Sequence, residues 1–167
     1  ELMSLLQSKG HEVLKINSHV LNKQTIDENI DSSWIISNFV HLNQECIQRF
    51  ISGVRYVIYE HDHKYLKTRN PSVYENYLAP EEDIINKDFY SNAIAVFCQS
   101  NKHASVVKQN LNLDNIVSVS GNLWREETLD MISDLSKLKK EEKCSIMMSP
   151  IEHKNTVDAI RYCKVKK

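Results

Sequence analysis

The stretch VRYVIYEHDH, residues 54–63, decides the fold: a continuous apolar run ends abruptly in acidic and imidazole side chains. Most apolar runs in this chain do not alternate apolar with polar residues, a pattern typical of parallel strands that helices cover on both faces. Such runs recur at residues 12–16, 34–37, 54–59, 93–98, 115–120 and 144–148. They predict strands that lie side by side and point in the same direction.

Segments with apolar residues at helical spacing separate these runs. Helices are expected over about residues 41–51, 79–93, 100–111 and 129–138. Ser100 is well placed to cap the third of them, because a serine oxygen accepts hydrogen bonds from the first backbone amides of a helix. The alternation of strand and helix predicts an α/β fold, specifically a Rossmann-like three-layer α/β/α arrangement around a mainly parallel sheet.

Composition excludes several classes of protein. The 167 residues contain 21 Lys+Arg and 22 Asp+Glu, so the near-zero net charge gives no reason to expect a nucleic-acid partner. No apolar stretch approaches the roughly 18 residues of a membrane span, and with 3 glycines no Gly-rich phosphate motif can be assembled. The four cysteines lack metal-like spacing and predict buried free thiols in a cytoplasmic protein.

The chain is expected to hold a Rossmann-like domain over residues 1–140 and the beginning of a second domain over 141–167. It opens inside a helix that ends at Gly10, and in this architecture a strand normally precedes such a helix. We therefore expect a sheet that lacks its first strand and a second part reduced to one strand and one helix. Residues 144–148 are expected to fill the vacant place in the sheet, within one chain or between two copies as a homodimer.

Polar residues follow the apolar runs, and the carboxyl ends of parallel strands meet at one edge, where ligands bind. These residues are Asn38, His61, Asp62, His63, Ser100, Gly121 and Asn122. In an extended chain His61 and His63 would project to the same side, and an imidazole can bind a sugar hydroxyl, act as a base or hold a metal. A purely structural role in loop packing is an equal alternative for both histidines.

The connection over residues 63–80 is long and mixes aromatic with basic residues. Its tyrosines are Tyr65, Tyr74 and Tyr77, and its basic residues are Lys64, Lys67 and Arg69. Long connections beside a ligand edge are often functional, so the tyrosines could stack on sugars while the basic residues meet an anionic acceptor. The alternative is a segment whose aromatic residues simply pack back on the domain.

Taken in order, five segments resemble the N-terminal, acceptor-side domain of GT-B fold glycosyltransferases, over about residues 1–124 and cut at both ends. They read LLQSKGHEVLKI, WIISNFVHL, YVIYEHDH, AIAVFCQSNKHASVVKQNL and NIVSVSGNLW. Gly10, His11 and Val13 match the turn that follows the first helix of that family. His61 with Asp62 matches the histidine that faces the transferred sugar, and Ser100 matches a serine that ends a strand.

The resemblance implies transfer of a sugar from a nucleotide-sugar donor to a saccharide or another hydroxyl acceptor. It implies His61 and Asp62 as catalytic residues and Ser100, Gly121 and Asn122 as substrate-binding residues. Asn38 and His63, which follow other apolar runs, are expected to bind substrate with them. Lys154 stands where the family has a lysine that meets donor phosphate, although Asn155 replaces the usual glycine. No metal or other cofactor is expected, because helix dipoles and basic side chains offset diphosphate charge in this fold.

Catalysis in such an enzyme needs both halves around the cleft, so the 167 residues alone are expected to be inactive. Two other functions stay open. One is a metal-dependent hydrolase that uses His61 and His63 as a His-x-His pair, and the other is a non-catalytic Rossmann-like binding module.

Overall fold

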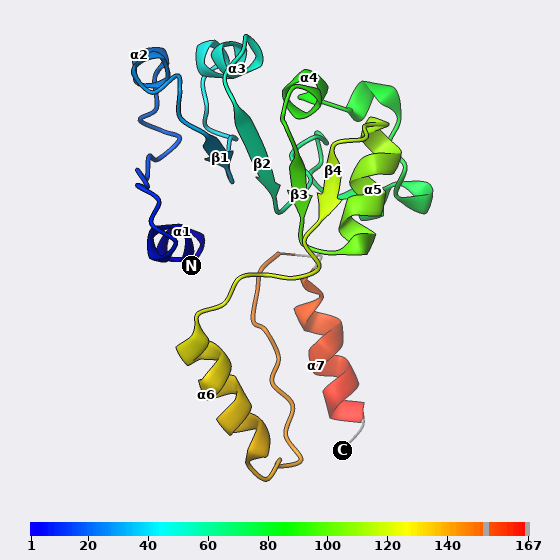
Figure 1. The fold of residues 1–167 in the computed structure, drawn as a ribbon. Helices are drawn as coiled ribbons and strands as arrows, with labels where there is room; N and C mark the ends of the chain where they lie inside the picture. The colour runs from blue at the N-terminus through cyan, green and yellow to red at the C-terminus, as the bar shows by residue number, and fades with distance from the viewer. Residues whose placement is uncertain (152–153, 166–167) are drawn as a thin grey trace. The chain divides into compact units, whose positions relative to one another are not determined.

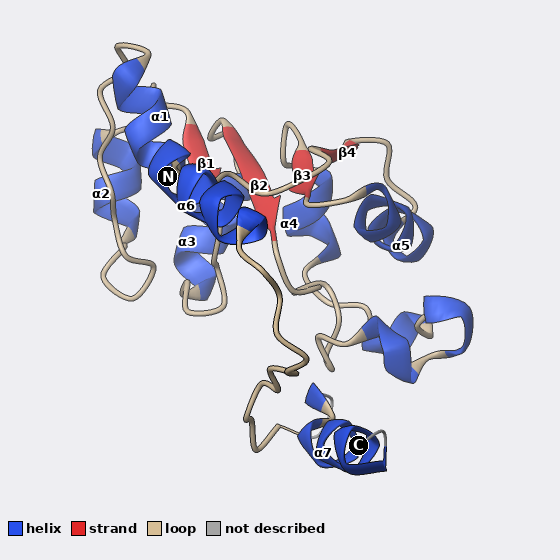
Figure 2. Cartoon of the chain, turned by 90° about the horizontal axis from the view of Figure 1, so that it is seen from below, coloured by secondary structure: helices blue, strands red, loops and turns tan. Residues whose placement is uncertain are grey.

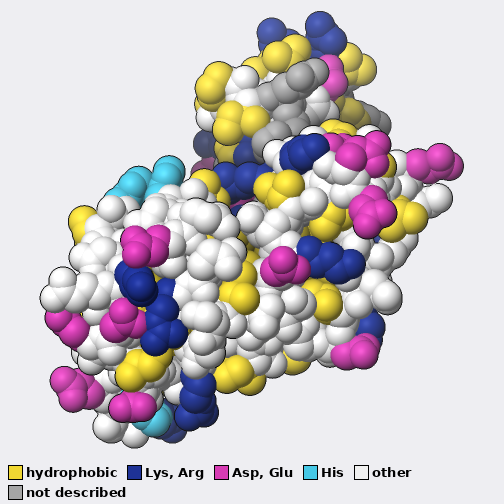
Figure 3. Space-filling model, turned by 90° about the horizontal axis from the view of Figure 1, so that it is seen from above, with side chains coloured by type: hydrophobic (Ala, Val, Ile, Leu, Met, Phe, Trp, Pro, Cys, Tyr) yellow, Lys and Arg dark blue, Asp and Glu magenta, His cyan; other side chains and the backbone are white. Residues whose placement is uncertain are grey.

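The structure is a computed structural model that describes residues 1–151 and 154–165. The chain divides into two compact units, Glu1–Trp124 and Arg125–Lys167, which Figure 1 colours from blue to yellow and from yellow to red. The division lies before the boundary expected after residue 140, because the helix α6 (Glu126–Lys137) belongs to the second unit. On the face that Figure 3 shows, basic and acidic side chains are interspersed.

A sheet of four parallel strands forms the centre of the first unit, and its strands follow one another in chain order. The strands are β1 (Trp34–Ile36), β2 (Tyr56–Glu60), β3 (Val96–Cys98) and β4 (Ile116–Ser118). In the register, Ile36 lies opposite Ile58, and Cys98 lies between Glu60 and Ser118. The predicted Rossmann-like α/β fold with a parallel sheet is confirmed.

Helices connect the strands. The first unit contains α1 (Leu2–Ser8), α2 (Lys23–Glu28), α3 (Gln44–Ile51), α4 (Lys87–Ser91) and α5 (Asn101–Leu111), and the second contains α6 and α7 (Thr156–Val165). Single 3-10 turns lie at η1 (Pro71–Val73), η2 (Glu75–Tyr77) and η3 (Glu81–Asp83). No helix among the described residues has the length and apolar character needed to cross a membrane.

The two faces of the sheet differ. Figure 2 shows α3, α4 and α5 on one side of the strands, and the alternate residues Tyr56, Ile58 and Glu60 of β2 are buried on that face. On the opposite face Ile35 and Val117 remain 42% and 43% exposed. The sequence predicted cover on both faces, whereas in this unit one face is closed by helices and the other stays partly open.

Two of the predicted strands do not form. Residues 12–16 and 144–148 are irregular and take part in none of the strand pairs found among the described residues. An apolar run becomes a strand only when a neighbour satisfies its backbone groups, and neither run has one here. The expectation that 144–148 fills a place in the sheet is therefore wrong for the single chain, and the homodimer remains a prediction.

The predicted helix over 79–93 is also wrong in part, because the chain forms η3, then a break, then α4. The break lies at Asn86, which has a left-handed φ of 58° and whose Nδ2 donates to the carbonyl oxygen of Lys64 at 2.9 Å. This tertiary hydrogen bond fixes a conformation that a continuous helix excludes.

The prediction of buried thiols holds for two of the four cysteines. Cys46 and Cys98 are buried in the core of the first unit, whereas Cys144 is exposed and Cys163 is half-buried. The last two lie in the second unit, Cys144 in an irregular segment and Cys163 in α7.

Candidate functional site

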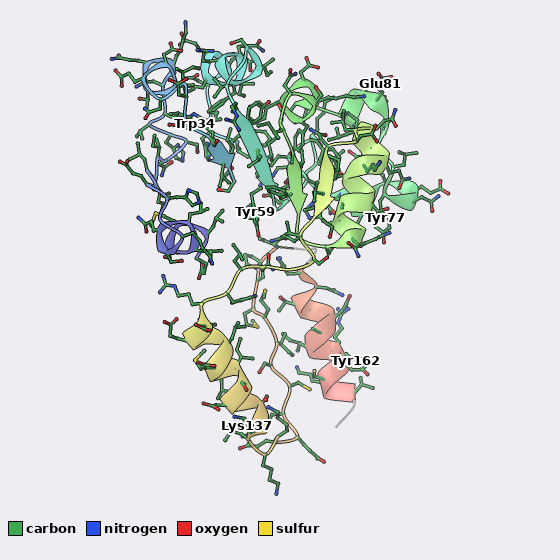
Figure 4. All side chains as sticks on the ribbon, viewed as in Figure 1. Trp34, Tyr59, Tyr77, Glu81, Lys137 and Tyr162 are labelled. Atoms are coloured by element: carbon green, nitrogen blue, oxygen red, sulfur yellow. The ribbon has the colours of Figure 1, made fainter. Side chains whose placement is uncertain are left out.

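The carboxyl ends of the four strands form one edge of the sheet, because all the strands are parallel. We call the residues that follow the strands at this edge the carboxyl rim. Figure 4 labels Tyr59 near this end of β2. Strand β2 reaches the rim at Glu60, which is paired with Cys98 of β3 and carries the His61-Asp62-His63 turn. Most of the polar groups that the sequence predicted for a site therefore lie in the first unit.

The buried carboxylate of Glu60 fixes the His61-Asp62-His63 turn through hydrogen bonds. This carboxylate is fully buried and accepts hydrogen bonds at Oε1 from the backbone amides of His61 and Asp62, both at 2.9 Å. The Lys64 ammonium donates to the same oxygen at 3.1 Å, and the Tyr90 hydroxyl donates to Oε2. Burial alone would raise the pKa of Glu60, but Lys64, Tyr90 and the Asp62 amide together hold it below its usual value.

Asp62 lies between two cations. Its Oδ1 is 2.8 Å from the Lys64 ammonium, and its Oδ2 accepts a hydrogen bond from the Arg69 guanidinium. Partial burial acts to raise the pKa of Asp62, but the two cations outweigh it and lower the pKa. The carboxylate is therefore ionised and engaged by protein groups, which suits a positioning role better than proton transfer.

The chain does not stay extended through the turn, so the condition under which His61 and His63 would project to the same side is not met. The ring of His61 lies 5.0 Å from the ring of Tyr59, which places His61 on the open face of the sheet. The chain then bends, because His63 adopts a left-handed φ of 55°. His61 is exposed and His63 is partly buried.

His63 packs against His103, a residue that the sequence did not assign to the site. Their ring centroids are 4.6 Å apart, and the Nδ1 of His63 lies 3.0 Å from the Tyr65 hydroxyl. Burial and the proximity of His103 lower the pKa of His63 to about 4. The signal for His103 was its position in the first turn of α5, three residues after Ser100, which brings it to the rim beside β2.

Burial also lowers the pKa of the other two imidazoles of this group. The pKa of His61 falls through burial and the neighbouring Lys64 charge. The pKa of His103 falls through burial first, with Lys64 and His61 adding to it. The three rings are consequently neutral at physiological pH, and a neutral imidazole can accept a proton or a hydrogen bond.

Two of the predicted substrate-binding residues have local structural roles. The Ser100 hydroxyl accepts a hydrogen bond from the backbone amide of His103 at 3.1 Å and so caps α5, as predicted. The Asn38 Oδ1 accepts from the amide of Val40 at 3.2 Å and turns the chain after β1. Both side chains stay exposed at the rim.

The strand ends of β3 and β4 are joined by a side-chain contact. Gln99 Nε2 donates to Asn122 Oδ1 at 2.6 Å, so Asn122 lies at the rim as predicted. The turn before it places its left-handed φ of 56° at Ser120 rather than at Gly121. A Cβ at Gly121 would meet no atom within 4 Å, so this glycine is exposed at the rim without a steric need for glycine.

The long connection after β2 is packed rather than loose. Tyr65 is fully buried, and the Tyr74 hydroxyl donates to Asp83 at 2.9 Å. Tyr77 lies beside α5, as labelled in Figure 4, and the Lys102 ammonium sits 4.3 Å from its ring centroid. Its aromatic residues therefore pack largely on the domain, which was the structural alternative for this segment.

The remaining predicted residue is in the second unit. Lys154 is exposed and precedes α7 by two residues.

The metal-dependent hydrolase considered as an alternative requires several ligand side chains close together. Within residues 1–151 and 154–165, no three His, Cys, Asp or Glu side chains come together as a metal site would need.

Comparison with known proteins identifies no relative. No family model matches the chain, and no curated protein matches it. No solved structure matches it either.

Proposed function

We propose that this chain is the acceptor-side part of a GT-B type glycosyltransferase, and that its carboxyl rim binds sugar hydroxyls through His61. The observation that carries the proposal is the placement of this imidazole. It is exposed beyond the end of β2 on the open face, while Glu60 fixes its backbone amide from the buried face at 2.9 Å.

The electrostatics of the rim support the same role. A lowered pKa keeps His61 neutral, so that one ring nitrogen can accept a hydrogen bond from a hydroxyl and remove its proton. Asp62 fixes the turn through its ion pairs with Lys64 and Arg69, and so acts as a positioning residue. Asn38, Ser100 and Asn122 add exposed neutral hydrogen-bonding groups at the same edge, the kind of group that a polyhydroxylated ligand needs.

The transfer reaction itself needs a nucleotide-sugar half on the other side of the substrate. In this proposal Lys154 would meet the donor phosphate from the second unit. Because the reacting groups must be held together by both halves, the 167 residues alone are expected to give no detectable transfer. Sustained turnover of a nucleotide sugar by the purified chain would contradict that expectation.

Sugar binding by this chain can be tested by NMR. We expect the imidazole resonances of His61 to shift on titration with glucose, galactose and N-acetylglucosamine, and the shifts at neighbouring rim residues to vanish in His61→Ala. The matched control is His11→Ala, which removes an exposed imidazole outside the rim. Absence of any rim shift with these sugars, or shifts that persist in His61→Ala, would contradict the proposal. Stoichiometric zinc or manganese in the purified chain would favour the hydrolase alternative.

A further inference from the structure

We propose that a cavity of about 210 Å³ in the first unit binds a carboxylate or phosphate group carried on an apolar body. The cavity lies between the chain that follows β1 and the chain that follows β2. Its apolar wall includes Phe39, Leu42 and Leu66, and its charged lining consists of Lys64, Lys67 and Arg69. This assignment does not depend on sugar transfer and can hold if that proposal fails.

The apolar wall is part of the core. Phe39, Leu42 and Leu66 are all buried and belong to the main hydrophobic cluster of the first unit. Such a wall is held in place by its neighbours, so the cavity does not need to be organised by a ligand. The hydrocarbon surface that a ligand can reach is supplied by the exposed Val40 and the half-buried Ile47 and Ile85, which also line the cavity.

The charges that line the cavity are all positive. Their acidic partners Glu60, Asp62 and Asp83 are not among the residues that line the cavity. Lys64 is almost completely buried, and its ammonium lies 3.1 Å from Glu60 and 2.8 Å from Asp62. An anion in the cavity would therefore meet cationic groups without a facing carboxylate.

Two of the three cations are available to a ligand. The side chains of Lys67 and Arg69 are 55% and 46% exposed, and Lys67 is 3.6 Å from its partner Asp83. Exposed ion pairs of this kind contribute little to stability, so an entering anion can share Lys67 or Arg69 with its acidic partner at little cost. Arg69 can in addition offer two parallel N–H donors to a carboxylate or phosphate.

The size of the cavity limits the ligand. Pockets for drug-sized molecules have roughly 300–1,000 Å³, so this smaller cavity fits one ring or a short chain with its anionic group. The expected ligand is accordingly a small aromatic or aliphatic acid, a phosphate monoester of similar size, or one end of a larger molecule.

Calorimetric titration of the full chain with benzoate, phenyl phosphate and benzyl alcohol, each of which carries one phenyl ring, tests the assignment. We expect benzoate or phenyl phosphate to bind at least tenfold more tightly than benzyl alcohol, and the tighter of the two anions identifies the head group. The variant carrying Lys67→Gln and Arg69→Gln should lose at least tenfold in affinity for that anion. Lys108→Gln, which removes an exposed α5 lysine that is paired with Asp114, is the matched control and should bind as the unsubstituted chain does.

A further pair of variants keeps the test independent of folding defects. Asp83→Asn releases Lys67 from its acid while leaving an oxygen for the Tyr74 hydroxyl, and should tighten anion binding several-fold. Val40→Asp places an acid at an exposed lining position and should weaken it at least tenfold. Equal binding of benzyl alcohol and the anions, no binding of either anion, or unchanged affinity in the Lys67/Arg69 double variant would overturn the assignment.

Discussion

Alternate residues of the same strands have very different surroundings on the two faces of the sheet. On the covered face, where α3, α4 and α5 lie (Figure 2), Tyr56, Ile58 and Val96 are buried. On the open face, Ile35 and Val117 keep more than two fifths of their surface in contact with solvent. The comparison shows that the hydrophobic stabilisation of this unit comes mainly from one side of the sheet.

The same division continues past the end of β2 into the candidate site. Glu60 points into the covered face and collects four hydrogen-bond donors, whereas His61 stands with Tyr59 on the open face. A side chain that binds a ligand must be exposed to solvent, whereas the side chain that holds its backbone in place must be buried. The alternation along one strand supplies both within two consecutive residues.

The largest effect is expected from removing apolar volume on the covered face. Ile58→Ala should lower the free energy of unfolding by about 2–5 kcal/mol, because Ile58 is completely buried and its loss leaves a cavity. Urea denaturation followed by circular dichroism measures this change. The matched control is Ile35→Ala on the open face, for which the loss should stay below about 1 kcal/mol. Similar losses in both variants would mean that the open face is covered in solution.

A smaller effect is expected at the polar end of the covered face. Tyr90→Phe removes the hydroxyl that donates to the buried Glu60 carboxylate and should cost about 1–3 kcal/mol of stability. Tyr59→Phe on the open face is the control, with an expected change within about 0.5 kcal/mol. The same urea titrations measure both variants. Equal stabilities of the two variants would show that the Tyr90 hydrogen bond does not support the turn.

The parallel sheet could be predicted because it depends on local pattern. Runs such as 54–59 are apolar without alternation, and segments with apolar residues at helical spacing separate most of them. Residues 12–16 and 144–148 have the same pattern and still form no strand, since a strand also needs a neighbour that supplies hydrogen bonds. Pattern shows which segments are able to join a sheet, and the partner decides which of them do.

The rim could be predicted only at the level of position. Asn38, Ser100 and Asn122 lie at strand ends as expected, because parallel strands bring their carboxyl ends together. The roles of Glu60 and His103 were not visible, since both depend on contacts between residues distant in sequence. A glutamate at the end of an apolar run gives no sign that a tyrosine thirty residues later will donate to it.

The smallest expected effect is the pH dependence of stability that His63 contributes. It can be distinguished from the contributions of the Glu60 and Asp62 carboxylates. The pKa of His63 is about 4 in the folded chain and near 6.5 when unfolded, so the unfolded chain binds the additional proton first. Stability should therefore be complete above pH 6.5 and decline as the pH falls toward 4, by about 1 kcal/mol between pH 7.5 and 5.5 after allowance for the partial exposure of the ring. His61 and His103 act in the same direction, whereas Glu60 and Asp62, whose pKa values are lowered, remain ionised throughout this interval. Urea titrations at the two pH values should show a flatter dependence in His63→Gln than in His11→Gln, and equal dependence in the two variants would mean that His63 is not held neutral by its surroundings.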